Sequence, residues 1–79
     1  MSANGVASTT GSLTSRELEV ATLIARGFSN RQIAQALVVA LPTAERHVAN
    51  ILHKLALASR AQVAIWAIKH AAPESRKEP

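Results

Sequence analysis

The sequence has no cysteine and no tyrosine, and it contains one phenylalanine and one tryptophan. The lack of cysteine excludes disulfides, zinc–thiolate sites and thiol nucleophiles, and it suits the cytoplasm. With so few aromatic residues, a core must be built from Ala, Val, Ile and Leu, which favours packed helices over a β-sandwich. A chain of 79 residues has room for one small domain, so the expected fold class is all-α.

Long hydrophobic runs are also lacking. No apolar segment approaches the roughly 18 to 20 residues that a membrane-spanning helix needs. The first twelve residues, "MSANGVASTTGS", have neither the basic start nor the apolar middle of a signal peptide. We therefore expect a soluble cytoplasmic protein without a membrane partner. Residues 1–12 and 73–79 are polar and without apolar periodicity, so we expect two disordered tails around a domain at 13–72.

Catalytic and cofactor-binding patterns are missing as well. The sequence has no Gly-rich phosphate loop and no nucleophile beside a base, so we predict neither an enzyme nor a cofactor or small-molecule site. His47 and His53 are six residues apart, on different faces of a helix, and no Cys or paired carboxylate supplies further ligands. We therefore expect no catalytic residue and no metal site.

Acidic residues are outnumbered by basic ones. Nine Lys and Arg against five Asp and Glu give a net charge of +4. From residue 26 to residue 60, the only acidic residue is Glu45, and the basic residues are Arg26, Arg31, Arg46, Lys54 and Arg60. A basic central segment suits a nucleic-acid partner, although ordinary solubility charge gives the same pattern.

The signals for helix starts are clear. Three Ser or Thr residues are followed three positions later by Glu or Gln, the spacing of a capping box. These pairs are Thr14 with Glu17, Ser29 with Gln32, and Ser59 with Gln62. We predict helices over about 15–26, 30–37, 43–55 and 60–71. The first should end at Gly27, which can adopt the left-handed conformation.

Apolar residues at helical spacing predict the core of a four-helix, bundle-like domain. They are Val20, Leu23, Ile24, Ile33, Ala34, Leu37, Ala44, Val48, Ile51, Leu52 and Leu55. The segment "VVAL" at 38–41 is too short for a paired strand, so we predict the turn of a central helix-turn-helix, with Val38 and Val39 in the core. Such turns also occur in proteins that do not bind DNA.

The outward face of the third predicted helix carries groups that can read DNA bases. Its members are Glu45, Arg46, Ala49, Asn50 and His53. Arg can pair with guanine, Asn with adenine and Glu with cytosine in the major groove, and a small residue allows close approach. A solvated helix face has the same polarity, so this pattern alone leaves both interpretations open.

The sequence resembles a known family at this point. "LTSRELEVATLIARGFSNRQIAQAL", "TAERHVANILHKL" and "SRAQVAIWA" are similar, without gaps over about residues 13–70, to the LuxR-type (GerE-like) DNA-binding domain of bacterial transcription regulators. The resemblance implies sequence-specific binding to double-stranded DNA by a symmetric dimer. The third helix would enter the major groove, and the fourth would form the dimer contact. By position, the base-facing residues are Glu45, Arg46 and Ala49, to which the helix face adds Asn50.

The resemblance also implies contacts to the DNA backbone, which take half to two-thirds of such hydrogen bonds. These fall on Ser29, Asn30, Arg31, Thr43 and Lys54. For the dimer contact, an apolar stripe on the fourth helix is formed by Ala61, Ile65, Ile68 and Ala72. A homodimer would cover this stripe, whereas a tightly wrapped monomer core is the alternative.

Four positions depart from the family pattern. Ala40 stands where relatives have a Ser or Thr cap, and Pro42 follows, so we expect the third helix to begin near Pro42 with Leu41 extended. Glu45 stands where Lys is frequent. Either Glu45 reads a cytosine, or it pairs with a neighbouring basic group and leaves the reading to Arg46, which we favour. Ala56 replaces a frequent Gly, which suggests a different exit from the helix.

Two functions follow from these observations. In the first, the chain is the DNA-binding output domain of a larger bacterial regulator, which we favour over a free-standing one. In the second, the helix-turn-helix is retained as a protein-interaction or dimerisation module with weak or no specific reading of DNA. Binding through several phosphates falls steeply with salt, whereas binding through an apolar interface does not, so salt dependence separates the two.

Overall fold

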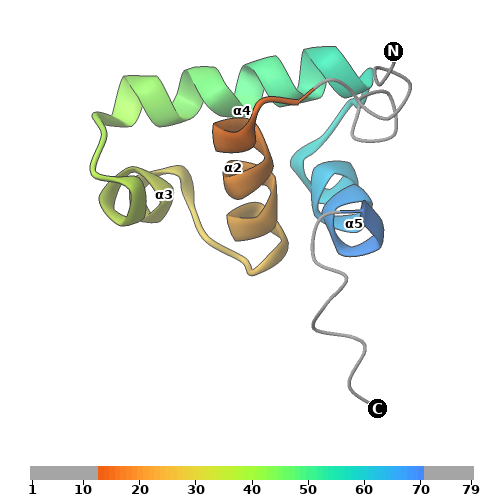
Figure 1. The fold of residues 1–79 in the computed structure, drawn as a ribbon, viewed down its shortest axis with the longest axis horizontal. Coiled ribbons are helices and arrows are strands. Elements are labelled where there is room, and N and C mark those ends of the chain that lie inside the picture. The colour runs from red at the N-terminus through yellow and green to blue at the C-terminus, as the bar shows by residue number, and fades with distance from the viewer. Residues whose placement is uncertain (1–12, 71–79) are drawn as a thin grey trace.

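The computed structural model describes residues 13–70, which form four α-helices and no strand. The helices are α2 (Ser15–Ala25), α3 (Asn30–Leu37), α4 (Leu41–Leu55) and α5 (Arg60–His70), as Figure 1 shows. The all-α class is therefore confirmed. The tails expected at 1–12 and 73–79 lie outside the described residues.

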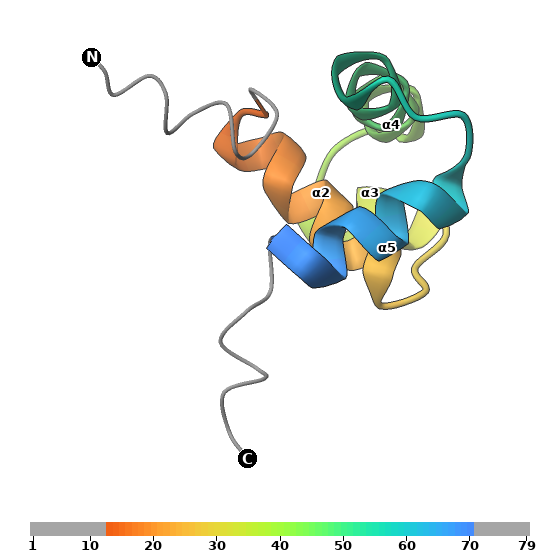
Figure 2. The ribbon, with the colours of Figure 1, turned by 90° about the vertical axis from the view of Figure 1, so that its right-hand side faces the viewer.

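The other three helices all pack on one side of α4. In Figure 1, α4 runs along the top, with α3, α2 and α5 below it. The view turned by 90° in Figure 2 again places α4 at the edge, while α5 lies beside α2. The most extensive helix contact joins α2 and α5, and both α2 and α3 pack against α4. This arrangement leaves one long face of α4 uncovered.

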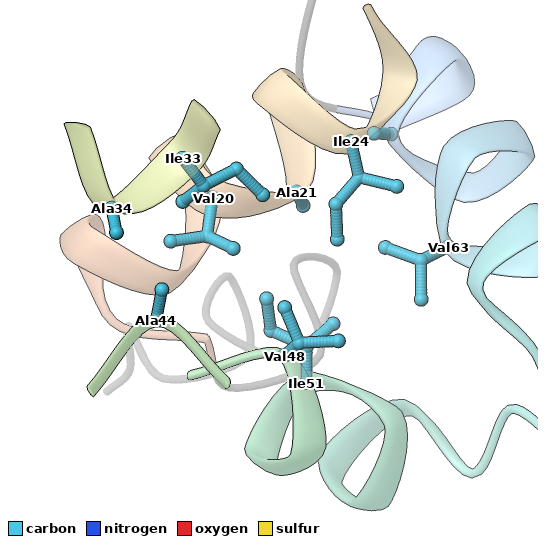
Figure 3. Close-up of a cluster of buried hydrophobic side chains, with 10 residues drawn as sticks. Val20, Ala21, Ile24, Ile33, Ala34, Ala44, Val48, Ile51 and Val63 are labelled. Atoms are coloured by element: carbon cyan, nitrogen blue, oxygen red, sulfur yellow. The ribbon is translucent and has the colours of Figure 1, made fainter. Parts of the chain in front are cut away.

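Each helix contributes one large, fully buried side chain to the core. Val20 comes from α2, Ile33 from α3, Ile51 from α4 and Val63 from α5. Figure 3 shows these side chains converging between the helices. The remaining members of the buried cluster are Ala21, Ile24, Ala34, Ala44, Val48 and Ala67. Most of the predicted core is confirmed, but Leu23, Leu37, Leu52 and Leu55 are partly buried around it.

All three predicted capping boxes are present. The Thr14 amide donates to Glu17 Oε1 at 3.0 Å, and the Glu17 amide donates to Thr14 Oγ1 at 3.1 Å. The Ser29–Gln32 pair makes the same two bonds at 2.8 and 3.1 Å, and the Ser59–Gln62 pair makes them at 3.3 Å each. These bonds satisfy amides that have no acceptor within the helix, and they fix where the helices begin.

A left-handed residue follows each of α2, α3 and α4. Gly27 has φ +88°, as predicted, and the residues that end α3 and α4, Val38 and Ala56, have φ 57° and 56°. At the end of α3, the Val39 amide donates to Ala34 O at 3.0 Å, and the Leu57 amide donates to Leu52 O at 2.9 Å at the end of α4. These bonds join residues five apart, as in the Schellman motif.

The prediction that Val38 packs in the core is wrong. Its side chain is 89% exposed, while Val39 packs against the core. The left-handed backbone at Val38 turns the chain so that only the following residue faces inward. At Ala56 the same conformation carries the chain out of α4, and whether this exit differs from that of relatives stays a prediction.

The start of α4 also differs from expectation. The helix begins at Leu41, so the extended residue is Ala40, with φ −71° and ψ 152°, and not Leu41. The amides of Thr43 and Ala44 both donate to Ala40 O, at 3.0 and 3.1 Å. Pro42 is tolerated because its missing N–H falls among the first helix amides, which have no acceptor within the helix. No side chain caps this start, as the loss of a hydroxyl at Ala40 predicted.

Val38→Gly is expected to raise the free energy of unfolding by about 1 kcal/mol, measured by urea denaturation. A branched side chain at positive φ costs roughly 1 to 2 kcal/mol, and the greater freedom of Gly in the unfolded chain offsets part of that gain. The exposed side chain loses no packing. As a matched control, Ala36→Gly in the exposed part of α3 should lower stability by about 1 kcal/mol. A destabilised Val38→Gly would contradict the strain argument.

Within residues 13–70, no helix has both the length and the apolar character that crossing a membrane would require.

Candidate nucleic-acid interface

The exposed face of α4 carries all four residues predicted to face DNA bases. Ala44, Val48 and Ile51 are buried and hold the helix against the core. Glu45, Arg46, Ala49 and Asn50 are exposed, and their positions i, i+1, i+4 and i+5 place them on one face. We call these four residues the outward face of α4. The helix thus presents one guanidinium, one amide and one carboxylate around a methyl group.

Glu45 and Arg46 are not engaged within the described part of the chain. Among residues 13–70, the ion pairs are Arg16 with Glu19 and Lys54 with Glu17. Within residues 13–70, Glu45 therefore forms no ion pair with the neighbouring basic group that we considered. The two charged groups are open to solvent and to a ligand.

The residues predicted to contact phosphate lie at helix ends. Ser29, Asn30 and Arg31 surround the start of α3, and Thr43 lies in the first turn of α4. The Ser29 hydroxyl accepts from the Gln32 amide, and Arg31 is exposed. The fold therefore brings a hydroxyl, an amide and a guanidinium together at one helix start, where the helix dipole favours an anion.

Lys54 differs from the other predicted phosphate contacts, because the protein itself uses its charge. Its Nζ donates to Glu17 Oε1 at 2.8 Å, and Glu17 is 4% exposed. Burial alone would raise the pKa of Glu17. The hydrogen bonds from Lys54 and Thr14, together with the positive charge of Lys54, outweigh burial and hold that pKa below its ordinary value. The place of Glu17 in the capping box of Thr14 was predicted from the sequence, but this ion pair was not.

Arg60 makes a second tertiary contact that the sequence did not reveal. Arg60 is the first residue of α5, and its Nη1 donates to Asn30 Oδ1 at 2.8 Å. Its Nη2 donates to the carbonyl oxygen of Phe28 at 2.6 Å. The guanidinium therefore joins the start of α5 to the start of α3, next to the predicted phosphate contacts.

The outer side of α5 is apolar. Val63 and Ala67 point into the core, while Ile65 and Ile68 are 56% and 54% exposed. Ala61 is exposed on the same stripe, and Ala72 lies outside the described residues. A shallow depression beside the stripe is lined by Leu57, Gln62, Ile65, Trp66, Lys69 and His70. The Trp66 and His70 rings stack there with centroids 5.0 Å apart.

No group of three or more His, Cys, Asp or Glu side chains that could hold a metal ion occurs within residues 13–70.

A short helix, a left-handed turn and a longer helix with an exposed polar face make this a helix-turn-helix domain. Residues 11–67 match the model of the family described as bacterial regulatory proteins, luxR family, and the chain belongs to that family. It is thus a DNA-binding domain of transcription regulation, and the family is one of regulators and not of enzymes.

Several curated relatives are similar to this chain. They include the response regulator protein VraR of Staphylococcus aureus, Staphylococcus saprophyticus and Staphylococcus epidermidis. Each is 47% identical over 58 residues, which cover 73% of this chain and 28% of the relative. The chain therefore spans less than a third of the length of these relatives.

Proposed function

We propose that this domain binds specific sequences of double-stranded DNA as a homodimer, with the outward face of α4 in the major groove. The observation that carries the proposal is the exposure of Glu45, Arg46, Ala49 and Asn50 together on the uncovered side of α4. An α-helix fits the major groove, where each base pair presents a distinct pattern of donors and acceptors. Arg46 can pair with guanine, Asn50 can pair with adenine, and Ala49 allows close approach.

Contacts to phosphate orient the domain on the duplex in this proposal. Ser29, Asn30 and Arg31 at the start of α3, with Thr43 in the first turn of α4, supply the donors. Lys54 can also contact a phosphate, but its ammonium is shared with the Glu17 carboxylate, with which it forms an ion pair. The negative charge of Glu45 repels the DNA phosphates. We therefore expect sequence specificity to come from the pairing of Arg46 with a base, and not from the net charge of the helix face.

The exposed stripe of α5 supports the dimer. Ala61, Ile65 and Ile68 are exposed on one stripe on the outer side of that helix, opposite the buried Val63 and Ala67. A second copy of the stripe is the simplest cover, because a two-fold axis brings identical patches together. Symmetric DNA half-sites would match that axis.

The relatives are longer than the matched segment, which bears on the role of this domain. The relatives are named response regulators, and the matched segment is 28% of their length. We infer that this chain is the output part of a longer cytoplasmic regulator, whose remaining part receives a signal and controls the dimer.

The test is selection of bound sequences from a randomised duplex pool, followed by titration of the selected site at two salt concentrations. We expect a two-fold symmetric motif, and an affinity that falls by orders of magnitude between about 50 and 200 mM salt if several phosphates are contacted. A single unpaired half-site would contradict the dimer. No motif, together with binding that ignores salt, would favour the protein-interaction module instead.

Two observations favour the protein-interaction module. The start of α4 has no side-chain cap, and Glu45 places a negative charge where DNA would approach. Both features weaken a DNA-reading helix, whereas neither would harm an apolar interface through α5.

A further inference from the structure

The contact between Arg60 and the start of α3 suggests a role that the helix-turn-helix alone does not assign. Arg60 is partly buried, and it meets two neutral oxygens, Asn30 Oδ1 at 2.8 Å and the Phe28 carbonyl at 2.6 Å. Arg60 forms no ion pair with a carboxylate among residues 13–70. Its positive charge is therefore held in place without being neutralised.

The contact fixes the orientation of the Asn30 amide. A guanidinium has only donors, so the Asn30 atom that it meets must be the side-chain oxygen. The Asn30 Nδ2, with its two hydrogens, is then directed away from Arg60. Asn30 thus carries a donor whose direction is set before any ligand arrives, which lowers the ordering cost of binding an acceptor.

The same contact holds the backbone that leads into α3. The Phe28 amide donates to Leu23 O at 3.1 Å, and the Phe28 carbonyl accepts from Arg60. Ser29 follows as the cap of α3. The segment from Phe28 to Asn30 is therefore fixed from α2 on one side and from α5 on the other.

The positive charge of Arg60 lies beside the start of α3, where a cation is electrostatically unfavourable. A helix start carries partial positive charge, so a cation there is repelled and an anion is attracted. The first turn of α3 contains no acidic residue to offset this repulsion. The two hydrogen bonds from the guanidinium, which its charge strengthens, hold Arg60 there against this repulsion. A phosphate at Asn30 would relieve the repulsion as well.

We propose that Arg60 is a positioning residue, which orients the Asn30 side chain to donate to a DNA phosphate and links the helix of the proposed dimer contact to the DNA-binding end of α3. This role rests on the proposed function. Arg60 acts through Asn30 and through the backbone at Phe28, and not by reaching the phosphate itself.

The test is a double-mutant cycle on binding of the full chain to its selected duplex, read by fluorescence anisotropy. Arg60→Met and Asn30→Ala should each weaken binding about tenfold, the equivalent of one hydrogen bond to a charged acceptor. The dissociation constant of the double variant should lie within about twofold of that of the weaker-binding single variant, because both changes remove the same contact. Losses that multiply would overturn the role of Arg60.

Arg60→Lys separates geometry from charge. Lys keeps the charge but lacks the planar fork that meets two oxygens at once, so binding should fall nearly as far as in Arg60→Met. Binding like that of the unsubstituted protein would mean that the charge alone acts, which would overturn the proposal. If Arg60→Met does not fold, as judged by circular dichroism, the cycle is run with Arg60→Lys in its place.

The nuclear magnetic resonance signal of the Asn30 side-chain amide gives a readout that a merely structural role would not move. In the unsubstituted protein it should shift when the duplex is added, and in Arg60→Lys the shift should be lost. Absence of duplex binding by the unsubstituted protein would overturn the proposed function and this role with it. Normal binding with an unmoved Asn30 signal would overturn this role alone.

Discussion

Lys54→Met is expected to lower the free energy of unfolding by about 3 kcal/mol at neutral pH, measured by urea denaturation. The variant leaves the Glu17 carboxylate, which is 4% exposed, without the ammonium that lies 2.8 Å away. Removing one partner of a buried pair typically costs about 3 to 5 kcal/mol. Because the Lys54 side chain is 34% exposed, the expected loss is at the lower end.

Two variants serve as controls. Glu17→Gln keeps an oxygen that can accept from the Thr14 amide, and it leaves Lys54 free to reach water, so the loss should be smaller, about 1 kcal/mol. Arg16→Met breaks the exposed Arg16–Glu19 pair, in which both side chains are about half exposed, and it should cost less than about 1 kcal/mol. Equal losses for Lys54→Met and Arg16→Met would contradict a special role for the buried pair.

The same ion pair predicts a pH dependence. Since the pKa of Glu17 is lower in the folded protein than its ordinary value, the ionised carboxylate contributes stability that is fully present above the unfolded pKa of about 4.3. That contribution is lost as the pH falls through the folded pKa. The stability difference between the unsubstituted protein and Glu17→Gln should therefore be constant above about pH 5 and shrink in acid. A constant difference down to pH 2 would exclude the linkage.

The sequence predicted the starts of α2, α3 and α5 because the bonds that fix these starts are local. Each capping box joins residues three apart, so its bonds depend little on the rest of the fold. The ends of α3 and α4 fall at the predicted residues, but the left-handed backbone that follows each of them was not predicted. Val38 and Ala56 do not favour positive φ, and they adopt it because the next residue bonds back to the helix and packs on the core. Only the end of α2 has a glycine, Gly27, the residue type that predicts a left-handed conformation.

In the candidate site, too, local features could be predicted from the sequence and contacts between distant residues could not. The exposed residues of α4 follow from helical periodicity, since a buried stripe at Ala44, Val48 and Ile51 turns the other side outward. The contacts of Lys54 and Arg60 could not be predicted, because their partners Glu17 and Asn30 lie 37 and 30 residues away along the chain. Such pairs depend on how the helices pack, which no local pattern encodes.

Arg46→Ala is expected to weaken binding to the selected duplex by about 10- to 100-fold and to relax the base preference at one position of each half-site. A bidentate contact of Arg to guanine contributes about 1 to 3 kcal/mol of discrimination. Arg46 is exposed and forms no ion pair among residues 13–70, so the fold should be unaffected. The measurement is repeated selection with the variant, together with its affinity for the original site.

Arg31→Ala is the matched control, since it removes the same charge from an exposed residue at the start of α3. As a phosphate contact, Arg31 should affect all duplexes alike and lower the salt slope by about one, without changing the motif. The pair of variants thus separates reading of bases from attraction to the backbone. An unchanged motif in Arg46→Ala would exclude Arg46 as the reader and leave Glu45, the other charged group on that face, to pair with a cytosine. Glu45→Gln should then relax the motif where Arg46→Ala did not.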